Sequence, residues 1–205
     1  MLQKLTNLRV IVRDLYQASD KDVPYHGWNH VRFVASKAAE YAVELKANIS
    51  LVTAAALLHD FNYLTSNNGD ESAARNLRSK MIKKAELDEV LADKVEVIIA
   101  EARTSRRHSG ISLEAQALSD GDTAFKVLPT TPLMTVSFLN ETGVSLRDLA
   151  HKIVHEQGPL MEKGIYFYSK SAEVEYGYWA HENLKMWNRV LESLDNDEIA
   201  ATFRH

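Results

Sequence analysis

Apolar residues recur at intervals of three and four along most of the chain, and this spacing limits the possible folds more than any other feature. In the N-terminal segment, for example, Leu5, Leu8 and Val12 follow one another at such intervals. This period places side chains on one face of an α-helix, whereas a half-buried strand needs strict alternation. The 205 residues include only 8 Gly and 4 Pro, too few for the many turns of a multi-stranded β fold. The sequence therefore predicts an all-α fold.

The same periodicity predicts about eight or nine helices in a single domain. We expect this domain over residues 1–195 and a frayed acidic tail over 196–205. Capping residues and Gly or Pro positions set the expected helix boundaries. The first helix is expected to end near Ser19-Asp20. Further helices are expected over 26–45, after the cap Ser50, over 70–84, after the cap Asp88, after the cap Ser112, from Thr131-Pro132 to Gly143, from Ser145 to before Gly158-Pro159, and over 171–194.

Charge and composition exclude several classes of protein. With 24 Lys+Arg and 28 Asp+Glu the net charge is −4, so we expect no nucleic-acid polymer as a partner. The absence of cysteine excludes disulfides, thiolate metal sites and a cysteine nucleophile. The longest apolar stretch, Leu51–Leu58, is interrupted by Thr53 and is far shorter than the ~20 residues that cross a bilayer. We therefore expect a soluble cytoplasmic protein without a signal peptide or a membrane partner.

The pair His59-Asp60 follows the apolar run AAALL, where the desolvation of polar groups is costly. A bound divalent ion would offset that cost, because imidazole and carboxylate groups are both metal ligands. The alternative is a helix end at which both side chains meet solvent. The pair alone leaves both interpretations open.

Two other features favour a metal site. His26 and His30, in PYHGWNHV, stand four residues apart and would share one face of a helix. Asp120 and Asp122 flank Gly121, which interrupts a predicted helix at a cost of ~1 kcal/mol relative to alanine. The candidate ligands are two histidines and two aspartates: His30, His59, Asp60 and Asp122. With waters they would complete a six-coordinate site for Mn, Mg, Fe, Ni or Zn.

The order H…HD…D, with the doublet closing an apolar helix, resembles the HD-domain superfamily of metal-dependent phosphohydrolases. NHVRFVASKAAEYA is similar to the helix of the first histidine, and AAALLHDFNY to the helix of the doublet. TSRRHSGISLEAQALSDGD is similar to the stretch that carries the last aspartate. The segment EKGIYFYSKSAEVEYGYWAHENLKMWNRVLESL is similar to the C-terminal helices of small bacterial members. The resemblance covers roughly residues 20–195 and implies a single HD-type helical bundle.

The resemblance implies metal-ligand roles for the same four residues. Asp122 is preferred to Asp120 because the family pattern is a small residue followed by aspartate. We expect Asp120 to point away from the metal, since residues two apart on a helix are rotated by about 200°. After the doublet this chain offers Asp70 and Glu71 where two-metal members carry histidines. One tightly bound ion is therefore expected, with a second, weaker ion left open through Asp60 and waters.

PYHGWNH also resembles the Tyr-His-Asn-x-x-His signature of cyclic-nucleotide phosphodiesterases, in which the earlier histidine protonates the leaving group. This implies that His26 is the catalytic acid and that Tyr25 packs beside it. The match departs from the signature at Gly27, which stands in place of asparagine.

The remaining candidates have two interpretations each. Arg107 and His108 form either a phosphate-facing rim or a solvated basic turn. Lys126 steadies Asp122 or touches a phosphate, or it forms a simple i,i+4 ion pair. Glu71 either orients the attacking water or is an acidic residue favoured in the first turn of a helix.

Together these features predict a divalent-metal phosphohydrolase that cleaves a small phosphoester, a nucleotide or a related phosphate, by attack of metal-bound hydroxide, with Asp60 and His26 in the chemistry. The sequence does not distinguish a phosphomonoesterase, a phosphodiesterase and a nucleotide pyrophosphohydrolase. The alternatives are an HD-fold di-iron oxygenase and a non-catalytic regulatory domain that binds metal or nucleotide. A homodimer stays open.

Overall fold

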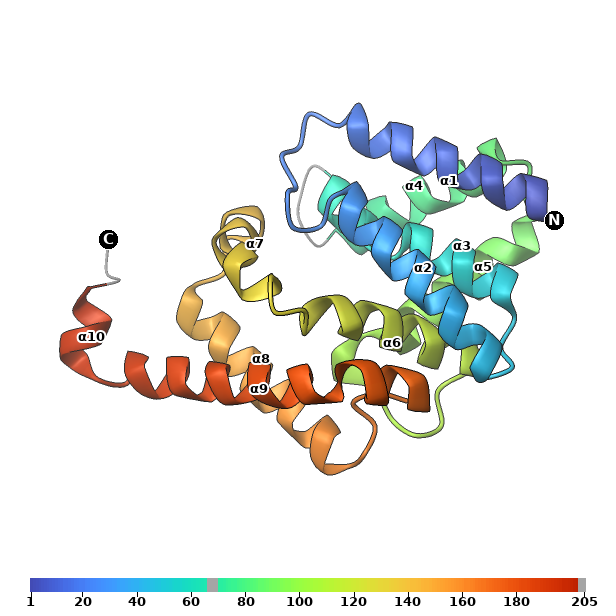
Figure 1. Ribbon diagram of the computed structural model, residues 1–205. Helices are drawn as coiled ribbons and strands as arrows, with labels where there is room; N and C mark the ends of the chain where they lie inside the picture. Colours follow the sequence, from blue (N-terminus) through green and yellow to red (C-terminus); the bar gives the residue numbers. More distant parts are fainter. Residues whose placement is uncertain (66–69, 203–205) are drawn as a thin grey trace.

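The computed structural model describes residues 1–65 and 70–202, and within them it contains ten α-helices and no strand. Nine of the helices have at least eight residues, which confirms the predicted all-α bundle. Figure 1 shows their arrangement. Their bounds are α1 Leu2–Gln17, α2 Trp28–Glu44, α3 Ile49–Leu58, α4 Glu71–Lys84, α5 Glu89–Ala102, α6 Leu113–Lys126, α7 Thr135–Thr142, α8 Leu146–Glu162, α9 Lys170–Leu194 and α10 Asp197–Ala201.

Helix α3 lies at the centre of the bundle, because its sequence ISLVTAAALL is apolar on nearly every side. It packs against α1, α2, α5 and α6, and Ala54–Leu58 are buried. Helices α8 and α9 pack on one another outside this bundle, around a small apolar cluster of Leu149, Ala150 and Trp187. The C-terminal end of α3 therefore delivers the residues that follow it to the middle of the molecule.

Several helix starts follow local capping chemistry. The side chains of Asp70, Asp88 and Ser112 each accept a hydrogen bond from the first turn of α4, α5 and α6, which confirms the predicted caps Asp88 and Ser112. The predicted cap Ser50 is wrong: Asn48 caps α3 by accepting from the backbone N–H groups of Ser50 and Leu51. Asparagine caps at least as well as serine, so the helix begins two residues earlier than predicted.

Helix α2 begins at Trp28, so the prediction that His26 lies on it is wrong. Gly27 is the N-cap residue, and its backbone is extended at φ −75° and ψ −174°. A Cβ atom at this position would lie 2.6 Å from the carbonyl oxygen of Val23. The chain thus needs glycine before α2 for a close backbone approach, and His26 belongs to the preceding loop.

Two boundaries in the C-terminal part also differ from expectation. Thr131-Pro132 opens a 3-10 turn, Thr131–Met134, and α7 begins only after it, although Gly143 ends α7 at φ +69° as predicted. Helix α8 continues through Pro159 to Glu162. Gly158 has no Cβ atom to collide with the proline ring, and buried Leu160 anchors the next turn.

The predicted tail contains the short helix α10, and residues 203–205 lie outside the described part of the chain. No helix in the described residues has the length and apolar character needed to cross a membrane.

Candidate metal centre

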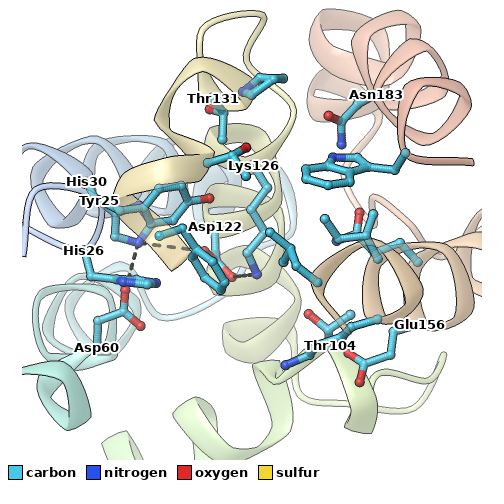
Figure 2. A pocket seen from close by; sticks show the side chains of 18 of the residues that line it. Tyr25, His26, His30, Asp60, Thr104, Asp122, Lys126, Thr131, Glu156 and Asn183 are labelled. Carbon is cyan, nitrogen blue, oxygen red and sulfur yellow. Dashed lines mark hydrogen bonds and ion pairs between the residues drawn. The ribbon is translucent and has the colours of Figure 1, made fainter. Parts of the chain in front are cut away.

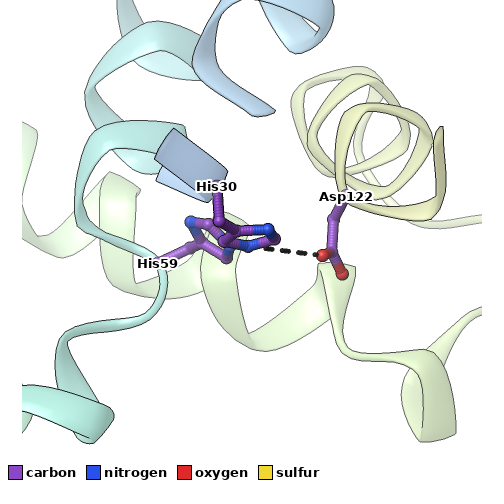
Figure 3. A group of neighbouring side chains, drawn as sticks. All are labelled: His30, His59 and Asp122. Carbon is purple, nitrogen blue, oxygen red and sulfur yellow. Dashed lines mark hydrogen bonds and ion pairs between the residues drawn. The ribbon is translucent and has the colours of Figure 1, made fainter. Parts of the chain in front are cut away.

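Three helices bring His30, His59 and Asp122 together at the centre of the molecule. His30 lies in the first turns of α2, His59 is the C-cap residue of α3, and Asp122 lies in α6. One ligand atom from each lies within 4.8 Å of the others, and Figure 3 shows the two imidazoles facing the carboxylate. Within residues 1–65 and 70–202 this is the one group of three or more such side chains, which suits a single ion.

Asp60 adjoins the same group. Its Oδ2 lies 2.9 Å from Nε2 of His30 and 3.1 Å from Nε2 of His59. The two Nε2 atoms are themselves 3.1 Å apart. The structure therefore brings together all four side chains that were predicted as ligands.

The surroundings of the group orient its imidazoles and shift their pKa values: burial alone would lower the pKa of His59, but Asp60 and Asp122 raise it above its usual value. Nδ1 of His59 lies 2.8 Å from the carbonyl oxygen of Ala56, and an N–H donated there leaves the lone pair on Nε2. Burial lowers the pKa of His30. Burial alone would raise the pKa of Asp60, but the imidazoles of His59 and His30 hold it well below its usual value. The donor set thus fits a divalent cation: two imidazole nitrogens and two carboxylate groups.

Lys126 holds the second aspartate. Its Nζ lies 2.5 Å from Oδ2 of Asp122. Burial alone would raise the pKa of Asp122, but Lys126 and the two imidazoles have the larger effect and hold this pKa below its usual value. The predicted i,i+4 pair is therefore present, and it leaves Oδ1 of Asp122 toward His30, at 3.9 Å from Nε2.

Asp120 points away from this group, as expected. It is fully buried and accepts hydrogen bonds from the backbone N–H groups of Tyr168 and Ser169 and from the Ser169 hydroxyl. Burial raises the pKa of Asp120 to about 6, although these three bonds oppose the shift. Its role is to attach the start of α9 to α6.

His26 lies beside the metal group although it is not on α2. Its ring centroid is 5.9 Å from that of His30, and the ring stacks on Tyr63 at 3.5 Å with an interplanar angle of 8°. Tyr25 packs against it edge-on at 4.7 Å, as the resemblance implied. Nδ1 of His26 lies 2.6 Å from Oε2 of Glu141, a residue that the sequence analysis missed because α7 carries no recognisable motif.

Two adjoining cavities, of about 180 and 360 Å³, open at the metal group. Asp60, Tyr63, Thr104, Asp122, Lys126, Lys152 and Glu156 line both. The first cavity continues past His26 to Gln157, Asn183 and Trp187, and Figure 2 shows Asn183 and Glu156 across from His26 and Asp60. The sequence did not indicate that residues of α8 and α9 line this cavity, since both helices show only amphipathic spacing.

Three predicted site residues either lie outside the two cavities or already form hydrogen bonds or ion pairs with other side chains. Arg107 is buried and donates to the Ala102 carbonyl and, at 2.6 Å, to the Thr123 hydroxyl, so the prediction of a phosphate-facing rim is wrong for it. His108 is exposed and lines neither cavity. Glu71 lines the second cavity, and its carboxylate pairs with Arg78 and Arg103. Its role in orienting a water stays a prediction.

Comparisons with known proteins agree with this arrangement. The family model described as HD domain matches residues 27–123, a segment that contains His30, His59, Asp60 and Asp122. No curated protein matches the sequence significantly. Among solved structures, a protein from Lactobacillus plantarum is 16% identical with a TM-score of 0.69, over 98% of this chain and 99% of that one.

Two further structures share the fold at low identity. One is Bacillus subtilis YpgQ, determined in complex with ADP: 18% identity, TM-score 0.61, 95% of this chain and 99% of that one. The other is a protein from Listeria innocua: 14% identity, TM-score 0.57, 94% and 96% coverage. At such identities the likeness shows the fold alone. It extends over nearly the whole chain, beyond the segment that the family model matches.

Proposed function

Residues 27–123 form an HD domain, and from this premise we propose that the protein is a divalent-metal-dependent phosphohydrolase acting on a small phosphoester. One observation carries the proposal: three of the four candidate ligands, His30, Asp60 and Asp122, line the same cavity as the histidine His26 and the lysine Lys126, and the fourth ligand, His59, lines the adjoining cavity. Hydrolysis of a phosphoester needs such groups close together, because the charge on the phosphoryl oxygens must be neutralised and the leaving oxygen protonated at the same site.

The chain would hold the ion through His30, His59, Asp60 and Asp122. When bound, a divalent ion supplies a water of lowered pKa and neutralises charge on the phosphoryl oxygens. Lys126 and Lys152 line both cavities, so their ammonium groups are available to phosphoryl oxygens at the junction. The ion pair with Asp122 restricts where the Lys126 ammonium can lie.

His26 supplies the proton for the leaving group in this proposal. A water oxygen bonds to phosphorus, the bond from phosphorus to the leaving oxygen breaks, and that oxygen takes the proton from Nε2 of His26. The water loses a proton to solvent, and a solvent proton restores the imidazolium. His26 lines the first cavity and not the second, so the leaving group belongs in the first.

We further propose a nucleotide or a related phosphate as substrate. The first cavity is lined by the aromatic ring of Trp187 and by the amides of Asn183 and Gln157, an apolar ring and hydrogen-bonding groups of the kinds that suit a nucleobase. The YpgQ structure of the same fold contains ADP, which supports nucleotides as the first substrates to test.

The test is a screen of nucleotides, cyclic nucleotides and sugar phosphates with Mn, Mg, Fe, Ni or Zn added. We expect turnover that disappears in Asp60→Ala and persists in Glu192→Gln, a control on the exposed surface of α9. Oxygen uptake by an iron-loaded protein would instead support an oxygenase. Tight metal binding without turnover of any phosphoester would support a regulatory domain.

A further inference from the structure

Glu141 belongs to α7, outside the segment matched by the family model, yet its carboxylate contacts the loop that precedes α2. It accepts a hydrogen bond from the backbone N–H of Tyr25, and the backbone N–H of His26 donates to Oε2 at 3.2 Å. Nδ1 of the His26 ring lies 2.6 Å from the same Oε2. A single carboxylate thus binds both the backbone and the ring of His26.

Both side chains are nearly inaccessible to solvent, at 7% exposure for His26 and 2% for Glu141. A buried carboxylate is costly unless donors surround it, and here the two backbone N–H groups supply donors. An ionised carboxylate only accepts hydrogen bonds. The proton of the contact must therefore lie on Nδ1 of His26, which leaves Nε2 as the nitrogen available to a ligand.

Aromatic neighbours hold the ring in this orientation. Tyr63 stacks on one face, Tyr25 packs edge-on, and Phe138 lies 5.5 Å away at 52°. A flip of the ring would break the contact with Glu141 and turn Nδ1 toward the cavity. The packing and the hydrogen bond thus favour the same single orientation.

We propose that Glu141 is a positioning residue: its carboxylate fixes His26 with Nδ1–H turned inward and Nε2 turned toward the leaving group. The catalytic consequence rests on the phosphohydrolase function proposed above, whereas the tautomer does not. Glutamine at position 141 has one acceptor oxygen and one donor group, so it cannot serve the two backbone N–H groups and Nδ1–H together.

The first measurement is ¹⁵N NMR of histidine-labelled protein at a pH where the His26 ring is neutral, with the signal assigned by its loss in His26→Ala. We expect Nδ1 to be protonated in the unaltered protein, in Glu141→Asp and in the exposed-surface control Glu192→Gln. In Glu141→Gln we expect the proton to move to Nε2. An unchanged tautomer in folded Glu141→Gln, or a proton on Nε2 in the unaltered protein, would overturn the proposal.

The second measurement compares two leaving groups, p-nitrophenyl phosphate and phenyl phosphate, with metal content checked in each variant. Loss of the orienting carboxylate of a histidine costs up to ~10⁴-fold in the serine-protease triad, so we expect at least ~10²-fold for phenyl phosphate with Glu141→Gln. The loss should be smaller for p-nitrophenyl phosphate, smaller again in Glu141→Asp, and not multiplied when His26→Ala is added.

Equal losses for both leaving groups that multiply with His26→Ala would mean a merely structural role and refute positioning. If the tautomer switches as expected but no variant hydrolyses any phosphoester, the proposed function fails and the role of Glu141 in fixing the ring stands.

Discussion

Gly121 offers a test in which helix propensity and tertiary packing predict opposite signs. It lies in α6 at the point of contact with α2. A Cβ atom there would lie 2.9 Å from both the Val34 carbonyl oxygen and the Ala38 backbone nitrogen, and 3.0 Å from Cβ of Ala38. Two of these are backbone atoms that cannot rotate away, so Gly121→Ala must push the two helices apart.

The magnitudes decide the sign. Alanine is favoured over glycine in a helix interior by ~1 kcal/mol. Overpacking a close-packed contact costs typically ~1–3 kcal/mol, and contacts to rigid backbone belong at the upper end. We therefore expect the free energy of unfolding to fall by about 1–2 kcal/mol. At 2–4 °C per kcal/mol for a chain of this size, the Tm should fall by roughly 2–8 °C.

The assay is urea unfolding of the metal-free protein, with Gly177→Ala in α9 as the matched control. A Cβ atom at position 177 would meet Oε1 of Glu173 at 2.6 Å, but that side chain is exposed and can rotate. The control should therefore gain up to ~1 kcal/mol. If Gly121→Ala also raises the urea midpoint, close packing of α2 and α6 does not explain the glycine. Metal affinity should fall in Gly121→Ala as well, because Asp122 moves with α6.

Three further outcomes follow from the metal group and its neighbour His26. Elemental analysis of the purified protein should find about one equivalent of a transition metal. The variants His59→Ala and Asp60→Ala should lose this metal. Chelation should lower the Tm of the unaltered protein, since a ligand bound only by the folded state stabilises that state. Asp122→Asn should lose metal and nearly all activity, whereas Asp120→Asn should keep the metal and lose stability at the α9 contact; the reverse pattern in metal analysis would refute the assignment. His26→Ala should keep the metal and slow hydrolysis by ~10²–10⁴-fold, less so for p-nitrophenyl phosphate; retained turnover of phenyl phosphate would exclude it as the acid.

Local chemistry explains what the sequence predicted well. Helix periodicity depends on which side chains share a face, and caps such as Asp70 and Ser112 bond to residues three positions away. The candidate ligands could also be predicted, because the His59-Asp60 pair ends a helix too apolar to lie anywhere but the core. A buried polar pair at such a place needs a partner, and the resemblance to HD domains indicated His30 and Asp122 among the other histidines and aspartates.

Long-range contacts decided the rest, and no local pattern contains them. His26 and Glu141 are 115 residues apart in sequence, so their pairing exists only after α7 folds back onto the loop before α2. Arg107 is one of several adjacent basic residues, yet its burial against α5 and α6 makes it structural. The sequence by itself determined the helices and the identity of the candidate ligands, because these depend on near neighbours and on apolar character. Only the tertiary structure decided which side chains reach the cavity, because that depends on where remote helices cross.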